Sequence, residues 1–217
     1  MNFVPDQTKL QLWDTWVYVT EQNQVHLFYL ANKPGGAWGY AGHAVSDDWL
    51  HWRDLPEIRL RGDDGAWDAG PCGTGMVFRH DDGRYYMTYT GALSTNEASG
   101  LFTSADLVHW EKLTPNAPYW PRTVSPPYET DDNRVAGSPA WRDAYVTRNP
   151  RGEWEAVCSA RVDAGPAAGR ACLALQACRA GPLDHAPPAR PYRTVLLDGN
   201  SGDFPLRRQI LGPVQHR

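Results

Sequence analysis

A seven-residue pattern, Ser-x-Asp-x-x-His-Trp, occurs twice in the chain and limits its fold more than any other feature. It first spans Ser46 to Trp52 and returns at Ser104 to Trp110, 58 positions later. An aromatic-rich run precedes each copy, HLFYL in the first and YYMTY in the second. A repeated unit of this length indicates supersecondary units that are stacked or arranged radially. The order of runs and turns is typical of a four-stranded β-propeller blade.

Alternating apolar runs and turn residues predict the strands of each unit. The expected strands are 14–19, 25–31, 39–46 and a short one after 52, then 73–78, 84–90, 100–104 and one from 110, then 142–147, 153–161 and 169–177. A Pro-rich stretch, 115–139, is expected to be a connection. We therefore expect an all-β fold, a partial propeller of three four-stranded antiparallel blades. The blades would cover about 10–62, 63–120 and 140–199 of one incomplete domain (1–199), and 200–217 would form an irregular tail.

The third unit keeps only a remnant of the pattern, RAGPLDH at 179–185. In the two intact copies, Trp52 and Trp110 are expected to pack, and His51 and His109 to tie the same turn. Propellers close with four to eight blades, and an arc of three leaves sheet faces uncovered. The chain is therefore expected to be a fragment, to self-associate with another copy, or to depart at its end from a longer ancestral frame.

Composition and charge exclude several classes of function. The net charge is −4 and the pI about 5.9, which does not favour nucleic acid or an anionic membrane as a partner. No apolar run approaches the ~20 residues of a membrane span, and the N-terminus lacks the basic and apolar regions of an export signal, so we expect a cytoplasmic protein. The four cysteines show neither Cys-x-x-Cys spacing nor a paired His, and we expect no metal and no cofactor.

Two aspartates occupy matching places at the starts of units. In a propeller the first strand of each blade lines the central channel, so Asp14 and Asp143 are expected to face one cavity. Two such carboxylates can divide the work, one as nucleophile or base and the other as an orienting or charge-balancing group. The alternative is that each caps local backbone amides at a strand end.

Aromatic residues near the channel fit a carbohydrate site, because sugar C–H faces pack on flat rings while polar groups fix the hydroxyls. The candidate substrate-binding residues are Trp16, Trp38, His43, Trp67 and Asp68. For each tryptophan, packing within or between blades is the alternative.

Four segments, in their order and spacing, resemble the five-bladed propeller glycosidases of glycoside hydrolase families 32, 43, 62 and 68. They are LWDTWVYVTEQNQVHLFYL, WGYAGHAVSDDWLHW, GTGMVFRHDDGRYYMTYTG and WRDAYV. The resemblance runs from about residue 10 to residue 177 and covers only the first three blades of such a protein. It implies that Asp14 is the nucleophile (families 32 and 68) or the general base for water (families 43 and 62).

The same resemblance implies that Asp143 stabilises the oxocarbenium-like transition state or tunes the acid, and that Arg142 holds sugar hydroxyls. For Arg142 an ordinary surface charge is the alternative. Two departures leave the branch open. The Asn-Asp-Pro-Asn-Gly loop of family 32 is here WDTWV, and the Pro of Arg-Asp-Pro is replaced by Ala144.

A third departure concerns the general acid, which this chemistry requires. The family places that Glu at the head of the fourth blade, near 190–205, but the chain has no Glu after Glu155, and only Asp198 and Asp203 could substitute. Losing the acid removes a step worth ~10²–10⁴-fold. We therefore expect a glycoside hydrolase for furanosides, xylosides or fructans, truncated before its acid, or a non-catalytic carbohydrate-binding remnant.

Two further classes fit less well. A glycosyltransferase or phosphorylase could use the same scaffold, but a phosphorylase needs a basic phosphate pocket that the sequence does not show. A protein-interaction propeller of the WD kind repeats every ~40–45 residues, which does not suit the spacing observed here.

Overall fold

The structure, a computed structural model, describes residues 11–32, 38–93, 96–120, 128–129 and 140–161, together with the backbone of two strands at 171–177 and 193–196. This part of the chain contains twelve strands and no helix. The strands are β1 (Gln11–Val19), β2 (Val25–Asn32), β3 (Tyr40–Ser46), β4 (Arg53–Arg59), β5 (Val77–Arg79), β6 (Tyr85–Leu93), β7 (Asn96–Ser104), β8 (Glu111–Lys112), β9 (Trp141–Arg148), β10 (Trp154–Arg161), β11 (Ala171–Ala177) and β12 (Arg193–Leu196).

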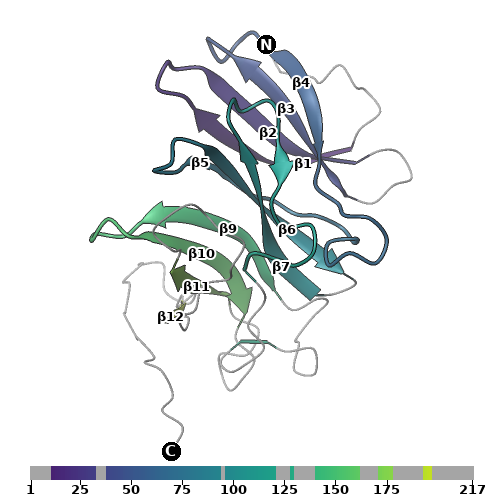
Figure 1. The fold of residues 1–217 in the computed structure, drawn as a ribbon, viewed down its shortest axis with the longest axis vertical. Coiled ribbons are helices and arrows are strands. Elements are labelled where there is room, and N and C mark those ends of the chain that lie inside the picture. The colour runs from purple at the N-terminus through teal and green to yellow at the C-terminus, as the bar shows by residue number, and fades with distance from the viewer. Residues whose placement is uncertain are drawn as a thin grey trace, which may run out of the picture.

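The strands form three separate four-stranded sheets, β1-β2-β3-β4, β5-β6-β7-β8 and β9-β10-β11-β12 (Figure 1). Every pair within a sheet is antiparallel and joins strands consecutive in the sequence. Strand β1 contacts β5, and β9 contacts β6 and β7, so each sheet packs against the next. The expected fold class, a partial β-propeller of antiparallel four-stranded blades, is confirmed. The tail predicted at 200–217 and most of the connection predicted at 115–139 lie outside the described residues.

Two apolar layers fill the spaces between successive sheets. The layer between the first and second sheets includes Trp16, Phe28, Met87 and Phe102, and the layer between the second and third includes Tyr86, Trp120, Trp141 and Val146. Both faces of the second sheet are therefore covered. This explains why the burial of β6 is nearly continuous instead of alternating.

The repeated pattern forms the same turn twice. The Asp48 carboxylate accepts hydrogen bonds from the backbone amides of Leu50 and His51 (2.8 and 2.7 Å), and its second oxygen lies 2.6 Å from the His51 ring. Asp106 repeats these contacts with Val108 and His109 at 2.9, 2.8 and 2.7 Å. The two histidines therefore tie the turns.

The two turns differ in how their apolar side chains are packed. The Trp110 ring packs edge-on against Phe28 of the first sheet, with centroids 5.9 Å apart. Leu107, at the turn's left-handed position (φ 65°), is buried, whereas Trp49 at the matching position (φ 66°) is exposed. The second turn therefore docks on the first sheet through Trp110, with Leu107 buried beside it.

Strand β5 is shorter than the predicted 73–78. Residues 73–76 still run beside β6, but only Gly73 forms a bridge, to Thr90, and the Met76 amide bonds to the Thr88 hydroxyl at 2.9 Å instead of joining a regular ladder. The backbone approaches β6 closely here, since a Cβ on Gly75 would lie 1.7 Å from the Thr88 carbonyl oxygen. Within the described residues, no helix has the length and apolar character needed to cross a membrane.

Candidate active site

A pocket of about 410 Å³ opens between β1, the segment that leads into β5, and β9. Its lining residues are Trp13, Asp14, Leu30, Trp38, Pro71, Cys72, Gly73, Thr74, Thr90, Glu97, Arg142 and Asp143. Four predicted site residues, Asp14, Trp38, Arg142 and Asp143, are thus brought together, although Asp14 and Asp143 are 129 positions apart in the sequence. The shared cavity expected for the two aspartates is therefore present in the structure.

Both aspartates lie at β-bulges. The β1–β2 register shifts between Trp13 and Thr15, so Asp14 has no regular partner. The β9–β10 register shifts between Val157 and Ser159, opposite Asp143, whose φ of 57° is a left-handed value rare for a residue with a side chain. A bulge turns a side chain out of the strand's alternation, and bulges are frequent beside active sites. The local backbone therefore aims both carboxylates into the pocket.

Threonine hydroxyls of the second sheet connect the two bulges. The Thr74 hydroxyl donates to the Asp14 carboxylate (2.6 Å). The buried Thr90 hydroxyl donates to the Thr74 carbonyl (3.2 Å) and accepts from the Asp143 amide (2.9 Å). Next to it, the Thr88 hydroxyl donates to the Ala144 carbonyl (2.8 Å). Side chains of the second sheet thus satisfy the backbone groups that the bulge in β9 removes from its ladder.

The electrostatics of the pocket distinguish Asp143 from an ordinary aspartate. Its side chain is open to the solvent of the pocket, but the walls displace part of its water, and this burial is the main cause that raises the pKa of Asp143 to about 6. The guanidinium of Arg142 opposes the rise in pKa, and the carboxylates of Asp14 and Glu97 add to it. Asp143 therefore exchanges its proton near pH 6, well above the range of an ordinary aspartate.

Glu97 and Trp13 are two of the pocket residues that were not singled out from the sequence. Glu97 of β7 forms an ion pair with Arg142 (3.1 Å) and accepts from the Trp141 amide (3.0 Å). Trp13 is 64% exposed, and its ring lies 6.5 Å from that of Trp38 between centroids. Trp13 directly precedes Asp14, so the sequence offered a signal for this residue. The position of Glu97 depends on the packing of β7 against β9 and left no local signal.

Two predicted tryptophans lie outside the pocket lining. Trp16 is 7% exposed in the layer between the first two sheets, and its ring stacks on Phe28 (5.9 Å between centroids). The Trp67 indole donates to the Thr114 carbonyl (2.8 Å), and its ring lies against Tyr89. The contacts of both rings are packing contacts, which is the alternative that the sequence left open.

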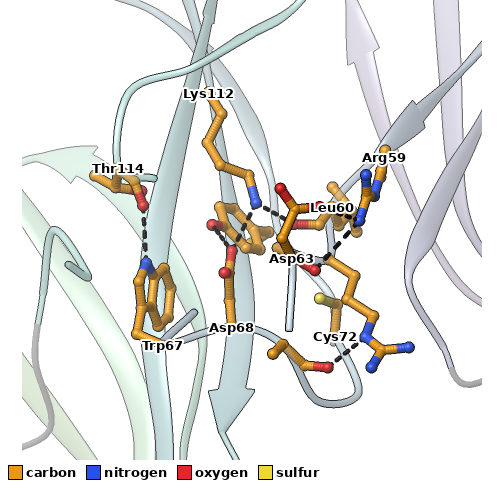
Figure 2. A network of polar contacts seen from close by, with 12 residues as sticks. Arg59, Leu60, Asp63, Trp67, Asp68, Cys72, Lys112 and Thr114 are labelled. Carbon is orange, nitrogen blue, oxygen red and sulfur yellow. Dashed lines mark hydrogen bonds and ion pairs between the residues drawn. The ribbon is translucent and has the colours of Figure 1, made fainter. Parts of the chain in front are cut away.

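Asp68 is fully buried and belongs to a polar network beside the first apolar layer (Figure 2). Its carboxylate accepts from the Tyr89 hydroxyl (2.6 Å) and pairs with the Lys112 ammonium (2.7 Å), which also donates to the Leu60 carbonyl (2.5 Å). Burial first, and the Asp68 charge second, raise the pKa of Tyr89 above its ordinary value. These contacts join the loop before β5 to β6 and β8.

His43 is 1% exposed and stacks on Phe28 with 4.2 Å between ring centroids. One of its ring nitrogens lies 2.9 Å from a nitrogen of His26. Burial, with the charge of His26 as a smaller cause, lowers the pKa of His43 to about 3, so the ring is neutral near pH 7. It lies inside the first sheet's packing layer and not at the pocket. Among the described residues, no group of three His, Cys, Asp or Glu side chains could hold a metal ion.

Two carboxylates that enter one pocket from β1 and β9 of a partial propeller are the arrangement that the resemblance to the propeller glycosidases predicted. The family model "Glycosyl hydrolases family 32 N-terminal domain" matches residues 14–166, which is more than half of the chain. The chain belongs to this family. The branch that the sequence left open between families 32 and 43 is thereby assigned.

The sequence relatives agree with this assignment. Beta-fructofuranosidase 1 of Zea mays is 39% identical over 111 residues, 47% of this chain and 16% of the maize protein. The Allium cepa bifunctional 6(G)-fructosyltransferase/2,1-fructan:2,1-fructan 1-fructosyltransferase is 33% identical over 127 residues, 55% of this chain and 20% of that protein. The chain thus spans a fifth or less of the length of these two relatives.

Among solved structures, fructan 1-exohydrolase IIa of Cichorium intybus, in complex with 1-kestose, aligns with a TM-score of 0.60 at 23% identity, over 80% of this chain and 31% of that chain. An endo-arabinase of Bacteroides thetaiotaomicron aligns with a TM-score of 0.60 at 13% identity, over 86% of this chain and 56% of that chain. At these identities the likeness shows the fold.

Proposed function

We propose that the chain forms the fructoside-binding pocket of a family 32 glycosidase and supplies two of its catalytic carboxylates. The observation that carries this proposal is the convergence of Asp14 and Asp143, each on a bulge, in one pocket. The names of the relatives, fructofuranosidases and fructosyltransferases, favour a β-fructoside over the xylosides and other furanosides that the sequence also allowed.

Asp14 is the proposed nucleophile. Its carboxylate attacks the anomeric carbon, the glycosidic C–O bond breaks, and the leaving oxygen takes a proton from a carboxylic acid; water then releases the sugar from the aspartyl ester. The Thr74 hydroxyl holds one Asp14 oxygen at 2.6 Å and leaves the other for the sugar. Asp143 and Arg142 balance charge and bind hydroxyls on the opposite wall.

The exposed Trp13 ring and the partly buried Trp38 ring give the pocket an aromatic wall. Apolar C–H faces of a sugar pack on such rings, and the nearby charged groups orient its hydroxyls. Of the candidate sugar-binding residues, we therefore keep Trp38 and Arg142 and add Trp13. We assign Trp16, His43, Trp67 and Asp68 to packing.

A second candidate function, binding without cleavage, has one observation in its favour. In the described part of the chain, the pocket carboxyl groups are Asp14, Asp143 and Glu97, and Glu97 is held in an ion pair with Arg142. The assigned roles therefore leave no described carboxyl group free to serve as the proton donor. In this case the chain would retain a sugar in the pocket and release no product.

The experiment compares the chain with its Asp14→Asn variant on 1-kestose and on p-nitrophenyl β-fructofuranoside, following both binding and product. A glycosidase releases fructose or p-nitrophenol, and Asp14→Asn lowers this release by a factor of 10³ or more, on the order expected for loss of a nucleophile. The control Asp64→Asn changes a fully exposed aspartate outside the pocket and should leave turnover unchanged.

Tryptophan fluorescence that changes with 1-kestose, without product, would support the binding function instead. Product release that is insensitive to Asp14→Asn would remove Asp14 from the mechanism. Absence of both binding and release over a panel of fructosides would overturn both functions.

A further inference from the structure

Glu97 links the second sheet to the two charged pocket residues of the third. Its side chain is only 15% exposed, and its two oxygens have separate partners, the Arg142 guanidinium at 3.1 Å and the Trp141 amide at 3.0 Å. Arg142, by contrast, is 42% exposed and is a long side chain with many rotamers. A largely buried carboxylate that holds both the Arg142 side chain and the start of β9 restricts that freedom.

We propose that Glu97 is a positioning residue of the pocket, which fixes the Arg142 guanidinium and the first amide of β9 and thereby sets the place and charge of the Arg142–Asp143 pair. The proposal rests on the proposed function, since that function assigns this pair to the sugar. The proposal extends that function to Glu97, which lies outside the inner strands, in the third strand of the second sheet.

The geometry favours this role over that of an ordinary surface ion pair. Trp141 is fully buried in the layer between the second and third sheets, and its amide is the first of β9. Glu97 therefore fixes the backbone of Trp141, whose ring is already held by the packing between the two sheets. Two positions further along, the Thr90 hydroxyl holds the Asp143 amide. The segment from Trp141 to Asp143 is thus held at both ends by side chains of the second sheet.

The charges around Asp143 make the role measurable. The groups that act on it are Arg142 on its own strand, Asp14 from β1 and Glu97 from β7. Glu97 acts twice. It adds a like charge near Asp143, and it engages the guanidinium that would otherwise serve Asp143 alone. Removing the charge of Glu97 should therefore make Asp143 easier to ionise.

The test follows the Asp143 carboxyl by ¹³C NMR as the pH is raised, with the signal assigned by its loss in Asp143→Asn. In the Glu97→Gln variant the midpoint is expected to move to lower pH by about half a unit. Glu97→Asp keeps the charge and should restore much of the midpoint. The control Glu111→Gln removes an exposed carboxylate outside this pocket and should leave it in place. An unchanged midpoint in Glu97→Gln would overturn the proposal, whatever the protein does with sugars.

Positioning is tested separately from charge. Glu97→Ala should speed hydrogen exchange at the Trp141 amide, which loses its acceptor. The affinity for 1-kestose should fall about tenfold in both Glu97→Ala and Arg142→Gln, and the double variant should be little worse than either single one, since the two residues act as a unit. Additive losses would refute the coupling. If the unsubstituted chain does not bind the sugar, the proposed function fails, while the NMR and exchange measurements still decide the role of Glu97.

Discussion

Replacing Asp68 should damage the stability of the fold and leave the intrinsic affinity of the pocket nearly unchanged. The sequence placed this residue among the sugar-binding candidates, but its carboxylate is fully buried and is shared between the Tyr89 hydroxyl and the Lys112 ammonium (Figure 2). Asp68→Ala leaves the ammonium without its anion and the phenol without its acceptor. Breaking a buried ion pair by removing one partner costs about 3–5 kcal/mol.

That magnitude is a large part of the roughly 5–15 kcal/mol by which a domain is stable. Asp68→Asn keeps an oxygen for the Tyr89 hydroxyl and loses only the charge, so its cost should be smaller, about 1–3 kcal/mol. Lys112→Met leaves the carboxylate buried without its cation and should resemble Asp68→Ala. The double variant Asp68→Asn, Lys112→Met should be more stable than the sum of the two losses, because no unpaired charge remains.

Urea unfolding followed by tryptophan fluorescence measures these differences, and titration with 1-kestose under native conditions measures the pocket. The expected result is an early unfolding midpoint in Asp68→Ala and a nearly unchanged dissociation constant for the molecules that remain folded. An unchanged midpoint with a weakened dissociation constant would show that Asp68 serves the sugar, and the reasoning from its burial would be wrong.

Two further predictions concern charged groups with altered pKa values. The pKa of Asp143 is raised to about 6, so between about pH 4 and pH 6 the native state keeps a proton that the unfolded chain has lost, and this group reduces stability as the pH rises. Asp143→Asn should therefore be more stable than the unsubstituted chain at pH 7 but not at pH 4. The gain should be about 1 kcal/mol or less, because the pocket is open to solvent, and urea unfolding at both pH values measures it. Hydrogen bonds from the histidines hold the pKa of Asp48 and Asp106 below the ordinary value, so the stability these turns contribute is present at neutral pH and lost as the pH falls below about 4. Asp106→Ala should lower the melting temperature more than Asp48→Ala at pH 7, since its turn carries the buried Leu107, and equal shifts would contradict this ranking.

The fold was accessible from the sequence because its information is local and repeated. The copies of Ser-x-Asp-x-x-His-Trp predict the turns after β3 and β7, and the carboxylates of Asp48 and Asp106 form the same contacts there. Two copies of one turn fix the phase of the strands around them. The start of β7 was placed too late, because the hairpin pairing of Leu93 with Asn96 extends the strand beyond its apolar run.

The pocket was accessible only in part, for a physical reason. Asp14, Asp143, Trp38 and Arg142 lie on or next to the strands that the channel argument selects, and the structure brings them together. Glu97 acts across a sheet-to-sheet interface, and such pairs carry no local pattern. His43 and Asp68 were named from the sequence as candidates for the sugar site near the channel. In the structure each is buried, His43 against His26 on the neighbouring strand and Asp68 against Lys112 of β8.

The bulges are the step at which sequence reasoning could have gone further. Side chains of a regular strand alternate, so Trp141, Asp143 and Tyr145 would share one face and Arg142, Ala144 and Val146 the other. In the structure Trp141, Ala144 and Val146 are the buried members, and this set changes face between 141 and 144. An apolar set that slips by one position within a strand indicates a bulge, and the residue at the slip is Asp143. The same slip separates the exposed Asp14 from the buried Trp16, two positions apart in β1. A carboxylate at a break in alternation is therefore a stronger sign of a site than a carboxylate at a strand start. The buried residues beside the bulge hold the backbone in the conformation that exposes the carboxylate.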